Sequence, residues 1–427
     1  MILNIQKLFE HKSEDIVNTP KGIKFFNIGV FLLVSAPAIA GVFLLISLIL
    51  SSLESEINYF RDRSNRIFIL SSILILSTTL INNIYHTGNN FLSGYEPFAS
   101  WIGTLNWIPY FYCFWAFQKF LKTSSLRKNT AINLISGSIP LLLSGIGQYW
   151  FDWHGPFKAF NGLIIWFQRP INPGDGVTGL FNNANYAGSW LVIILPFIIA
   201  CFYQLSLSKI QKFVISILLS TVGILIYLSQ SRNALLGSIL SLQLFYESKY
   251  IFVFLIFSIL VIIALISKSE ILRNQLFFGN FSNFNFESFP RLNIYKETIN
   301  FIIERPILGW GSASFPLLFF SRNYKWYGHP HNIFLELAIS YGLISALFVG
   351  YGILSILLKS FKSIYLSNQF PINTKKSKNY YFDKAWWTAT TILLFSQFFD
   401  IQYFDFRIGI IFWIFLSGLS KIKDPIY

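Results

Sequence analysis

The stretch that decides the fold is NIFLELAISYGLISALFVGYGILSILL, residues 332–358, in which Glu336 is the only charged side chain. A helix that crosses a membrane needs about 20 consecutive apolar residues, so this run predicts a membrane-spanning helix. Similar apolar blocks recur along the chain. They predict an all-α polytopic membrane protein with 11 or 12 transmembrane helices, and the candidate spans are residues 24–50, 67–82, 104–121, 131–149, 184–203, 211–229, 233–246, 250–267, 332–358, 385–399 and 407–420.

The composition supports this class. Hydrophobic residues make up 54% of the 427 residues and charged residues only 12%, whereas a soluble domain has about 25% charged residues. The net charge of +14 comes from 33 Lys and Arg against 19 Asp and Glu. In a membrane protein such an excess is typical of cytoplasmic loops. No Lys/Arg run with interleaved aromatic residues is present, so we expect no nucleic-acid partner.

The positions of the basic residues predict which loops share a side. Lys and Arg gather in the loops at 51–66, 119–130, 204–212 and 359–384, which places these loops in the cytoplasm. The loops between them, including 268–330, then lie outside. The first span leaves two alternatives: if residues 24–50 cross once the N-terminus is outside, and if they bend around Pro37 into two short helices it is inside.

These sides give a simple organisation. We expect an N-terminal cytoplasmic tail at 1–23, the first part of the bundle at 24–267, a large outer loop at 268–330, and the last part of the bundle with a short cytoplasmic tail at 331–427. Within the large loop, RLNIYKETINFIIERP predicts an amphipathic helix that begins at Arg291 and lies on or near the outer membrane face. Its expected apolar stripe consists of Leu292, Tyr295, Ile299 and Ile302.

The tetrad His329, Pro330, His331 and Asn332 stands directly before the decisive span. Pro330 excludes a regular helix before it, and Asn332 is a good N-cap candidate. His331 then lies at the positive end of a helix dipole, which disfavours a protonated imidazole. A neutral imidazole can accept a proton from a hydroxyl group, so His331 is a candidate base. The alternative for His331 is a histidine that only caps the helix. For His329 the expectation is that it shapes the turn or contacts substrate.

A metal site is the other interpretation of two histidines in this spacing. His329 and His331 form an H-x-H pair, but zinc needs further ligands. His154, with Asp152 beside it, is the candidate third ligand, and no recognisable spacing joins it to the pair. The sequence therefore predicts no metal and no cofactor.

Three arginines are candidates for phosphate binding on the outer side. Arg232 lies between two apolar segments, where a charge is costly unless it pairs or binds a ligand. A guanidinium offers forked donors to phosphate oxygens, and Arg291 is the expected second arm of such a clamp. Arg305 is a further substrate-binding candidate. A snorkelling Arg232 and an ordinary solvated face for the other two are the alternatives.

Other polar residues at the outer ends of spans complete the candidate set. Asn185 opens the span at 184–203 and is a candidate for binding sugar hydroxyls, as is Asn332. Glu336 lies one turn inside the span after His331 and is a partner for an arginine or a proton relay. In the last outer turn, Asp400 and Asp405 are carboxylates that could orient an imidazole, although a local salt bridge with the nearby arginine is the alternative.

Four of these stretches, in this order, resemble the O-antigen ligase and O-antigen polymerase superfamily of bacterial polysaccharide assembly. They are GLFNNANYAGSWLVIILPF, SQSRNALL, RLNIYKETINFIIERPILGWG and HPHNIFLELAISYGL. The ligase pattern is His, then Asn, Ser or Gln, nine residues and Gly, which fits His331, Asn332 and Gly342. The pattern continues with Gly, Thr or Tyr three positions later, and this chain departs from it with Ser345.

The resemblance implies glycosyl transfer in the bacterial inner membrane, with the active site on the periplasmic side. It implies a donor polysaccharide on undecaprenyl diphosphate, an acceptor sugar hydroxyl on lipid A–core or another glycolipid or glycan, contact with membrane lipids, and no metal or nucleotide. Carried over by position, His331 is the base or acceptor-orienting group, and Arg232 and Arg291 stabilise the leaving diphosphate. The large outer loop then lies in the periplasm.

Three alternatives stay open on the sequence alone. A polymerase would join lipid-linked repeat units, and a transfer to protein belongs to the same set. A non-enzymatic multi-pass transporter is the hypothesis from another class, and it predicts ionisable residues and broken helices at mid-membrane depth. Here the charged residues gather at the outer ends of the spans, with Glu336 as the exception.

Overall fold

The structure is a computed structural model that describes residues 20–55, 58–89, 92–204, 207–246, 290–323, 325–366 and 380–422. The predicted tail up to residue 19, the predicted span at 250–267 and the part of the large loop before residue 290 lie outside the described residues. The helices are α2 (Ile23–Leu32), α3 (Pro37–Leu53), α4 (Arg66–Asn89), α5 (Pro97–Thr104), α6 (Ile108–Phe117), α7 (Ser124–Gly137), α8 (Ile139–Trp150), α9 (Ala184–Phe202), α10 (Lys209–Leu228), α11 (Arg232–Tyr246), α14 (Pro290–Glu304), α15 (Phe315–Asn323), α16 (Ile333–Phe361), α17 (Tyr380–Ser396) and α18 (Phe406–Leu419).

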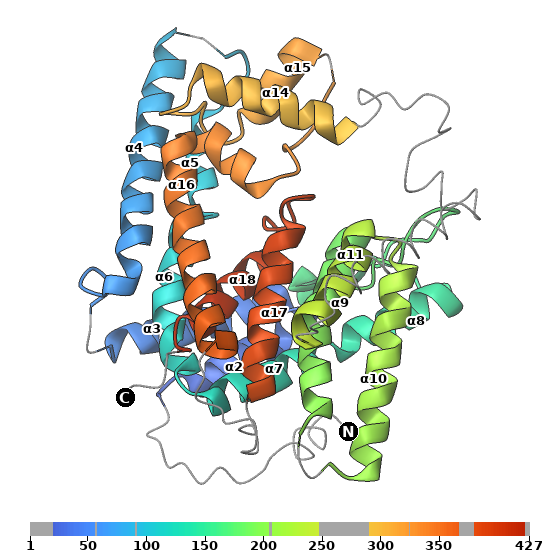
Figure 1. The fold of residues 1–427 in the computed structure, drawn as a ribbon. Coiled ribbons are helices and arrows are strands. Elements are labelled where there is room, and N and C mark those ends of the chain that lie inside the picture. The colour runs from blue at the N-terminus through green and yellow to red at the C-terminus, as the bar shows by residue number, and fades with distance from the viewer. Residues whose placement is uncertain are drawn as a thin grey trace.

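Helices dominate the described chain, and the predicted class of all-α polytopic membrane protein is confirmed (Figure 1). By length and composition, 5 helical stretches among the described residues could cross a membrane: Arg63–His86, Ser124–Trp150, Ala184–Phe202, Lys209–Leu228 and Ile333–Leu366. Shorter apolar helices, such as Ile23–Leu32, Pro37–Leu53 and Phe406–Leu419, accompany them. The total of 11 or 12 spans stays a prediction.

The predicted span at 104–121 is wrong as a single helix. The structure divides this stretch between the end of α5, then α6, and a short 3-10 helix at Gln118–Leu121. Pro109 stands at the start of α6, where its missing N–H costs nothing, whereas inside a helix it would remove a backbone hydrogen bond.

The first span bends, as the second of the two alternatives requires. Helices α2 and α3 meet at Pro37 and lie against each other, and Gly29 lets Leu44 approach so closely that a Cβ on Gly29 would lie 2.7 Å from the Leu44 Cγ. The turn between the two helices is tied to the hairpin described below, because Trp166 Nε1 donates to the Ser35 carbonyl at 2.7 Å.

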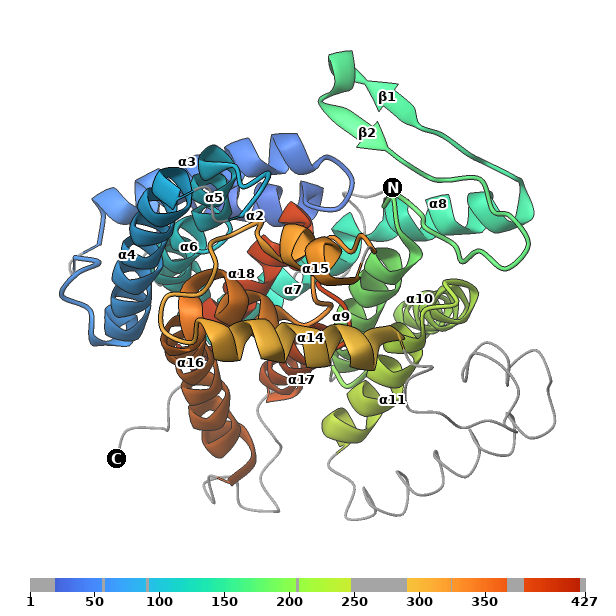
Figure 2. The ribbon, with the colours of Figure 1, turned by 90° about the horizontal axis from the view of Figure 1, so that it is seen from above.

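The segment at 150–183, which was predicted to lie outside, contains a small antiparallel hairpin that the sequence did not predict. Its strands are β1 (Phe157–Ala159) and β2 (Ile164–Trp166), and Lys158 pairs with Ile165. The hairpin projects from the bundle beside α8 (Figure 2). It is too short to change the fold class.

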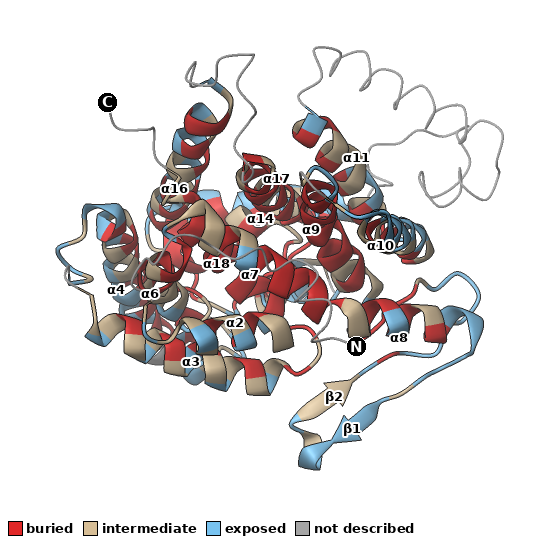
Figure 3. Cartoon of the chain, turned by 90° about the horizontal axis from the view of Figure 1, so that it is seen from below, coloured by how far each residue is buried: buried red, intermediate tan, exposed pale blue. Residues whose placement is uncertain are grey.

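The core lies where α7, α9, α17 and α18 meet, and the buried residues concentrate there (Figure 3). Large aromatic side chains fill it. Trp386 on α17 contacts Phe197 on α9, with ring centroids 5.7 Å apart, and Phe415 on α18, with centroids 5.1 Å apart. Lipid is as apolar as these side chains, so the hydrophobic effect does not hold helices together inside a membrane. Close packing of this kind therefore stabilises the bundle.

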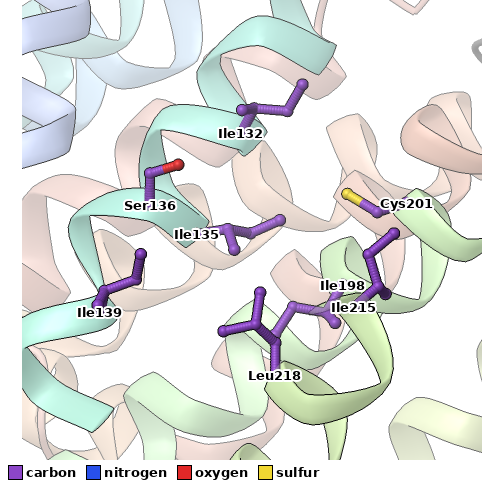
Figure 4. Close-up of a pocket in the computed structure, with 8 residues that line it drawn as sticks. All are labelled: Ile132, Ile135, Ser136, Ile139, Ile198, Cys201, Ile215 and Leu218. Atoms are coloured by element: carbon purple, nitrogen blue, oxygen red, sulfur yellow. The ribbon is translucent and has the colours of Figure 1, made fainter. Parts of the chain in front are cut away.

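A small pocket between α7, α8, α9 and α10 belongs to this packing rather than to a site (Figure 4). Its volume is about 20 Å³, which is room for about one water molecule. The lining is almost wholly apolar, and Ser136 and Cys201 supply its polar atoms. A sugar or a phosphate does not fit there.

The basic loops that were predicted to share a side do meet at one end of the bundle. Arg127, buried in the first turn of α7, pairs with Asp383 in the first turn of α17 at 2.7 Å. Lys128 donates to the Gln204 side chain at 2.6 Å, which joins the loop after α9 to the same place. Lys119 pairs with Glu54 after α3 at 2.8 Å. The described parts of the loops at 51–66, 119–130, 204–212 and 359–384 therefore lie together, at what we call the basic end.

Helices α14 and α15 lie across the opposite end of the bundle (Figures 1 and 2). The amphipathic helix was predicted to begin at Arg291, and α14 begins at Pro290. Part of the predicted stripe is not packed on the described protein, and its contact with the membrane stays a prediction. Leu292 and Ile299 are 41% and 46% exposed, and the face packed on the protein carries Ile294, Thr298 and Phe301. The helix is apolar on two sides, so periodicity alone could not select the side that is packed.

Candidate functional site

The site begins at the first turn of α16. Asn332 is the N-cap, as its position before the apolar run predicts, and its Oδ1 accepts hydrogen bonds from the Phe334 and Leu335 N–H groups at 3.0 and 3.1 Å. Its Nδ2 donates to the Phe398 carbonyl at 3.3 Å. The Asn332 side chain is thus used to begin the helix and to join it to the end of α17.

His329 shapes the turn that precedes this cap. Its Nδ1 accepts a hydrogen bond from the His331 N–H at 3.2 Å, and the two imidazole rings lie 4.5 Å apart. His331 adopts a left-handed backbone with φ 55°, which is unusual for a residue other than glycine. Burial, followed by the charges of His331 and Arg291, lowers the pKa of His329 to about 4, although Asp400 opposes the shift. His329 is therefore neutral at neutral pH and can accept this hydrogen bond.

His331 forms a dyad with Asp400, a residue far away in the chain. The His331 Nδ1 and the Asp400 Oδ1 lie 3.1 Å apart. An ionised carboxylate can only accept, so the hydrogen belongs to Nδ1. The other ring nitrogen, Nε2, then keeps its lone pair and can accept a proton from an incoming hydroxyl.

Asp400 is held in place by groups from α9 and α17. Asn185 Nδ2 donates to the Asp400 Oδ2 at 3.2 Å. Burial by itself raises the pKa of Asp400, but the hydrogen bond from His331 and the electrostatic effects of His331, His329 and Arg291 outweigh it and lower the pKa. Asp400 therefore stays ionised at neutral pH, as the dyad requires.

The turn that carries Asp400 is built around Gln397. Its Oε1 accepts from the N–H groups of Gln402 and Tyr403, each at 3.0 Å, and its backbone carbonyl accepts from the Ile333 N–H at 3.0 Å. The last contact joins this turn directly to the first residue of α16. The dyad is thus fixed from both sides.

Helix α14 brings Arg291 and Tyr295 to this place. The Tyr295 hydroxyl donates to the Phe398 carbonyl at 2.9 Å and to the His331 carbonyl at 3.4 Å. Arg291, one turn earlier, is exposed, and no hydrogen bond or ion pair joins it to another described residue. Its charge acts on both His329 and Asp400. Arg291 therefore offers its guanidinium to the space beside the dyad.

Arg232 approaches the same space from the start of α11. The neighbouring Asn233 donates through Nδ2 to the Ser396 carbonyl at 3.1 Å, which fixes this helix start next to the Asp400 turn. Arg232 and Arg291 lie close enough for their positive charges to repel each other. Two like charges held together favour an anion between them. The structure thus brings Arg232, Arg291 and His331 together, although they are far apart in the sequence.

Gly342 explains the spacing of the motif. It interrupts α16 with φ 86° and ψ 158°, and a Cβ there would lie 1.9 Å from the Ile307 carbonyl oxygen. The segment after α14 docks onto this break, because the Leu343 N–H donates to the Pro306 carbonyl at 2.7 Å and the Trp310 N–H donates to the Ile339 carbonyl at 2.7 Å. A residue with a side chain at this position would displace α14, and with it Arg291.

Arg305 and Glu336 do not lie in the dyad. Arg305 follows the other end of α14, roughly 20 Å from Arg291 at the rise of a helix. There its guanidinium lies 4.4 Å over the Tyr85 ring and 5.0 Å from the Trp310 ring. Glu336 is buried, its Oε1 accepts from Ser340 at 3.0 Å, and its Oε2 has no hydrogen-bond partner in the described part of the chain. No ion pair joins it to either arginine of the site.

Sequence reasoning undervalued two residues of this site. Asp400 was one of two carboxylates in the last outer turn, and a local salt bridge was the alternative for both. The structure separates them, because Asp405 pairs with Arg407 while Asp400 faces His331. Tyr295 was placed only on an apolar stripe, and nothing in the sequence marks its hydroxyl as a link between α14 and the histidine turn.

The cluster also has the composition of a three-ligand metal site. The ligand atoms of His329, His331 and Asp400 all lie within 4.8 Å of one another. His154, the third ligand considered from the sequence, faces Asp152 instead, at 3.8 Å. Catalytic zinc sites have three protein ligands and an open position, so a divalent ion would fit the donor set. The direct hydrogen bond between Nδ1 of His331 and Asp400 uses one of those donor atoms.

The fold and the site define a class: a multi-pass helical membrane protein with a carboxylate-oriented histidine and two converging arginines at one end of the bundle. Residues 214–350 match the family model described as O-antigen ligase, which confirms the resemblance to the O-antigen ligase superfamily. The matched region contains Arg232, Arg291 and His331 and ends before Asp400. No curated protein matches the chain significantly. The match supports an enzyme of the ligase or polymerase type that acts on lipid-linked glycans in a membrane.

Proposed function

We propose that the protein is an O-antigen ligase, which transfers a polysaccharide from undecaprenyl diphosphate to a sugar hydroxyl of lipid A–core or a similar acceptor. The observation that carries the proposal is the His331–Asp400 dyad beside two arginines whose charges repel each other. A base and an anion site side by side are what a transfer from a diphosphate to a hydroxyl needs.

In the proposed reaction, the acceptor hydroxyl gives its proton to Nε2 of His331. Its oxygen forms a new bond to the anomeric carbon of the donor sugar. The bond between that carbon and the phosphate oxygen breaks, and its electron pair leaves with the lipid diphosphate. Arg232 and Arg291 neutralise the charge that develops on the diphosphate, and Asp400 stabilises the imidazolium.

We propose that this reaction is independent of a metal. Arg232 and Arg291 already supply the positive charge that a divalent ion would bring to a diphosphate. A chelator test separates the two possibilities. Transfer by the purified protein should be unchanged in EDTA, whereas a loss that zinc or magnesium restores would assign His329, His331 and Asp400 as metal ligands.

The proposed setting is the bacterial inner membrane, with the dyad on the periplasmic side. The basic loops at the opposite end support this orientation, because positive loops stay in the cytoplasm. A cysteine introduced at Lys325, an exposed residue shortly before His329 in the chain, should be labelled from outside the cell, and one at Lys209 should not. The reverse pattern would contradict the orientation.

The polymerase is the alternative within the family, and the transporter is the alternative from another class. A deletion strain distinguishes all three. Loss of capped lipopolysaccharide with accumulation of lipid-linked polymer supports the ligase, and a single repeat left on the core supports the polymerase. Normal glycans with lost uptake of a solute would favour the transporter and overturn the proposal.

A further inference from the structure

A second feature lies at the basic end of the bundle, far from His331. It is a cavity of about 580 Å³ between the start of α4, the last turns of α16 and the end of α18. Ligand pockets commonly have volumes of about 300–1,000 Å³, so this one has the size of a binding site. The 15 residues that line it include Arg63, Arg66, Lys359 and Lys362 but no acidic side chain.

No described neighbour neutralises the four cations of this cavity. All four are exposed, and none forms an ion pair with a carboxylate in the part of the chain that the structure describes. Asp62, the acid next to Arg63, accepts from the backbone N–H and the hydroxyl of Ser64 and so begins a short helical turn. Four like charges around one cavity favour an anionic occupant.

The same cavity has an apolar wall. Ile67 and Leu70 on α4 and Tyr351 and Ile356 on α16 line it together with the cations. Leu70 and Tyr351 are 48% and 66% exposed, which is expected of side chains that face lipid. A free inorganic phosphate gains nothing from such a wall, whereas a phospholipid places its headgroup among the cations and its acyl chains against the apolar residues.

A close contact between α4 and α16 determines where the cavity lies. Gly352 lets α16 approach α4 closely, since a Cβ on it would lie 2.9 Å from the Phe68 ring. Beyond this contact α4 carries Arg66 and α16 carries Lys359, and both residues line the cavity. Basic pockets between helices on the cytoplasmic side are a known way to bind anionic headgroups.

We propose that this cavity binds the phosphate headgroup of an anionic membrane lipid, with its acyl chains along α4 and α16. The ligand is distinct from the glycan donor, because the cavity lies at the end of α16 opposite to His331. Binding here would tie α4 and α16 together at the membrane surface, and it does not depend on the transfer reaction.

The test is native mass spectrometry of the purified protein with phosphatidylglycerol, with phosphatidylethanolamine, and with inorganic phosphate. The wild-type protein should retain phosphatidylglycerol selectively. The variant K359Q/K362Q should retain it roughly 25-fold less, because each Lys or Arg near an anionic headgroup contributes about a fivefold change in affinity. The variant K359R/K362R should retain it as the wild type does. K209Q/K212Q, which removes two exposed lysines from the basic end outside the cavity, is the matched control and should also retain it.

Each other outcome would contradict either the site or the assignment of an anionic lipid as its ligand. Equal retention by K359Q/K362Q and wild type would show that the cavity is not the site, and R63Q/R66Q tests the same point from α4 if the first variant does not fold. Equal retention of phosphatidylethanolamine would show that charge does not select the ligand. Displacement of phosphatidylglycerol by inorganic phosphate at millimolar concentration would show a free-phosphate site instead.

Discussion

The two ends of α16 present charged groups in opposite ways. At its start, a hydrogen bond to Asp400 orients His331. Asp400 itself is held by Asn185 on α9, and its loop is joined by a hydrogen bond to the backbone of α16. At its end, Lys359 and Lys362 stand with Arg63 and Arg66 around a cavity and pair with no described carboxylate. A group that transfers a proton needs one orientation and one tautomer, whereas an electrostatic anchor needs only charge. The comparison predicts that substitutions at the first end change rate and that substitutions at the second change lipid retention.

The largest effect is expected for His331→Gln. The glutamine keeps a polar side chain but cannot accept the proton, so transfer should fall by roughly 10²–10⁴-fold, the usual contribution of a general base. A reconstituted assay with lipid-linked glycan and acceptor measures it. His154→Gln, at an exposed residue away from the dyad, is the control and should transfer as the wild type does.

The next effect is expected for the arginines. Arg291→Gln and Arg232→Gln each remove one cation from the leaving diphosphate, and loss of one such group reduces kcat by roughly 10²–10³-fold. Because both act on one leaving group, the double variant should lose less than the product of the two single losses. Arg322→Gln is the matched control, because it removes an exposed arginine of α15 that pairs with Glu304 at the end of α14. Strict multiplication of the two losses would show that the arginines act at separate places.

A smaller effect is expected for Asp400→Asn. The amide cannot hold the imidazole in one tautomer as the carboxylate does, and partners of this kind change activity by roughly 10–100-fold. The loss should appear in kcat with KM nearly unchanged, because Asp400 acts through His331. A change confined to KM would instead make Asp400 a substrate-binding residue.

The smallest effect concerns pH and stability. The pKa of His329 is lowered from 6.5 to about 4 in the folded protein, so the unfolded chain binds more protons between these values. Folding stability should therefore fall as the pH decreases from about 6.5 to 4. His329→Gln should flatten this part of the profile of thermal unfolding. The lowered pKa of Asp400 acts in a more acidic window, below its ordinary 3.8. An unchanged profile between pH 6.5 and 4 would contradict the neutral His329.

The sequence predicted the ends of the decisive elements well. Pro330 and Asn332 define the start of α16 because proline and an N-cap act locally, and α14 begins one residue before the predicted Arg291. The bend at Pro37 was one of two alternatives for the same local reason. Local signals of this kind do not depend on which helices later pack together.

The rest depends on tertiary contacts that spacing does not encode. Asp400 and Asp405 lie five positions apart in one turn, and only the packing of α17 against α16 separates a dyad partner from a salt bridge. The break at Gly342 exists because the segment after α14 docks there. The basic cavity joins Arg66 to Lys359, which are almost 300 positions apart in the chain. Pairings over such distances follow from the fold as a whole.

The most direct measurement of the central claim is transfer by the purified protein, with release of the lipid diphosphate followed together with glycosylation of the acceptor. Wild-type protein should form both products in equal amounts, in the presence of EDTA, while His331→Gln and Arg291→Gln lower both and K359Q/K362Q leaves both unchanged. Transfer at the wild-type rate by His331→Gln would contradict the account, because the oriented imidazole would then have no part in the reaction.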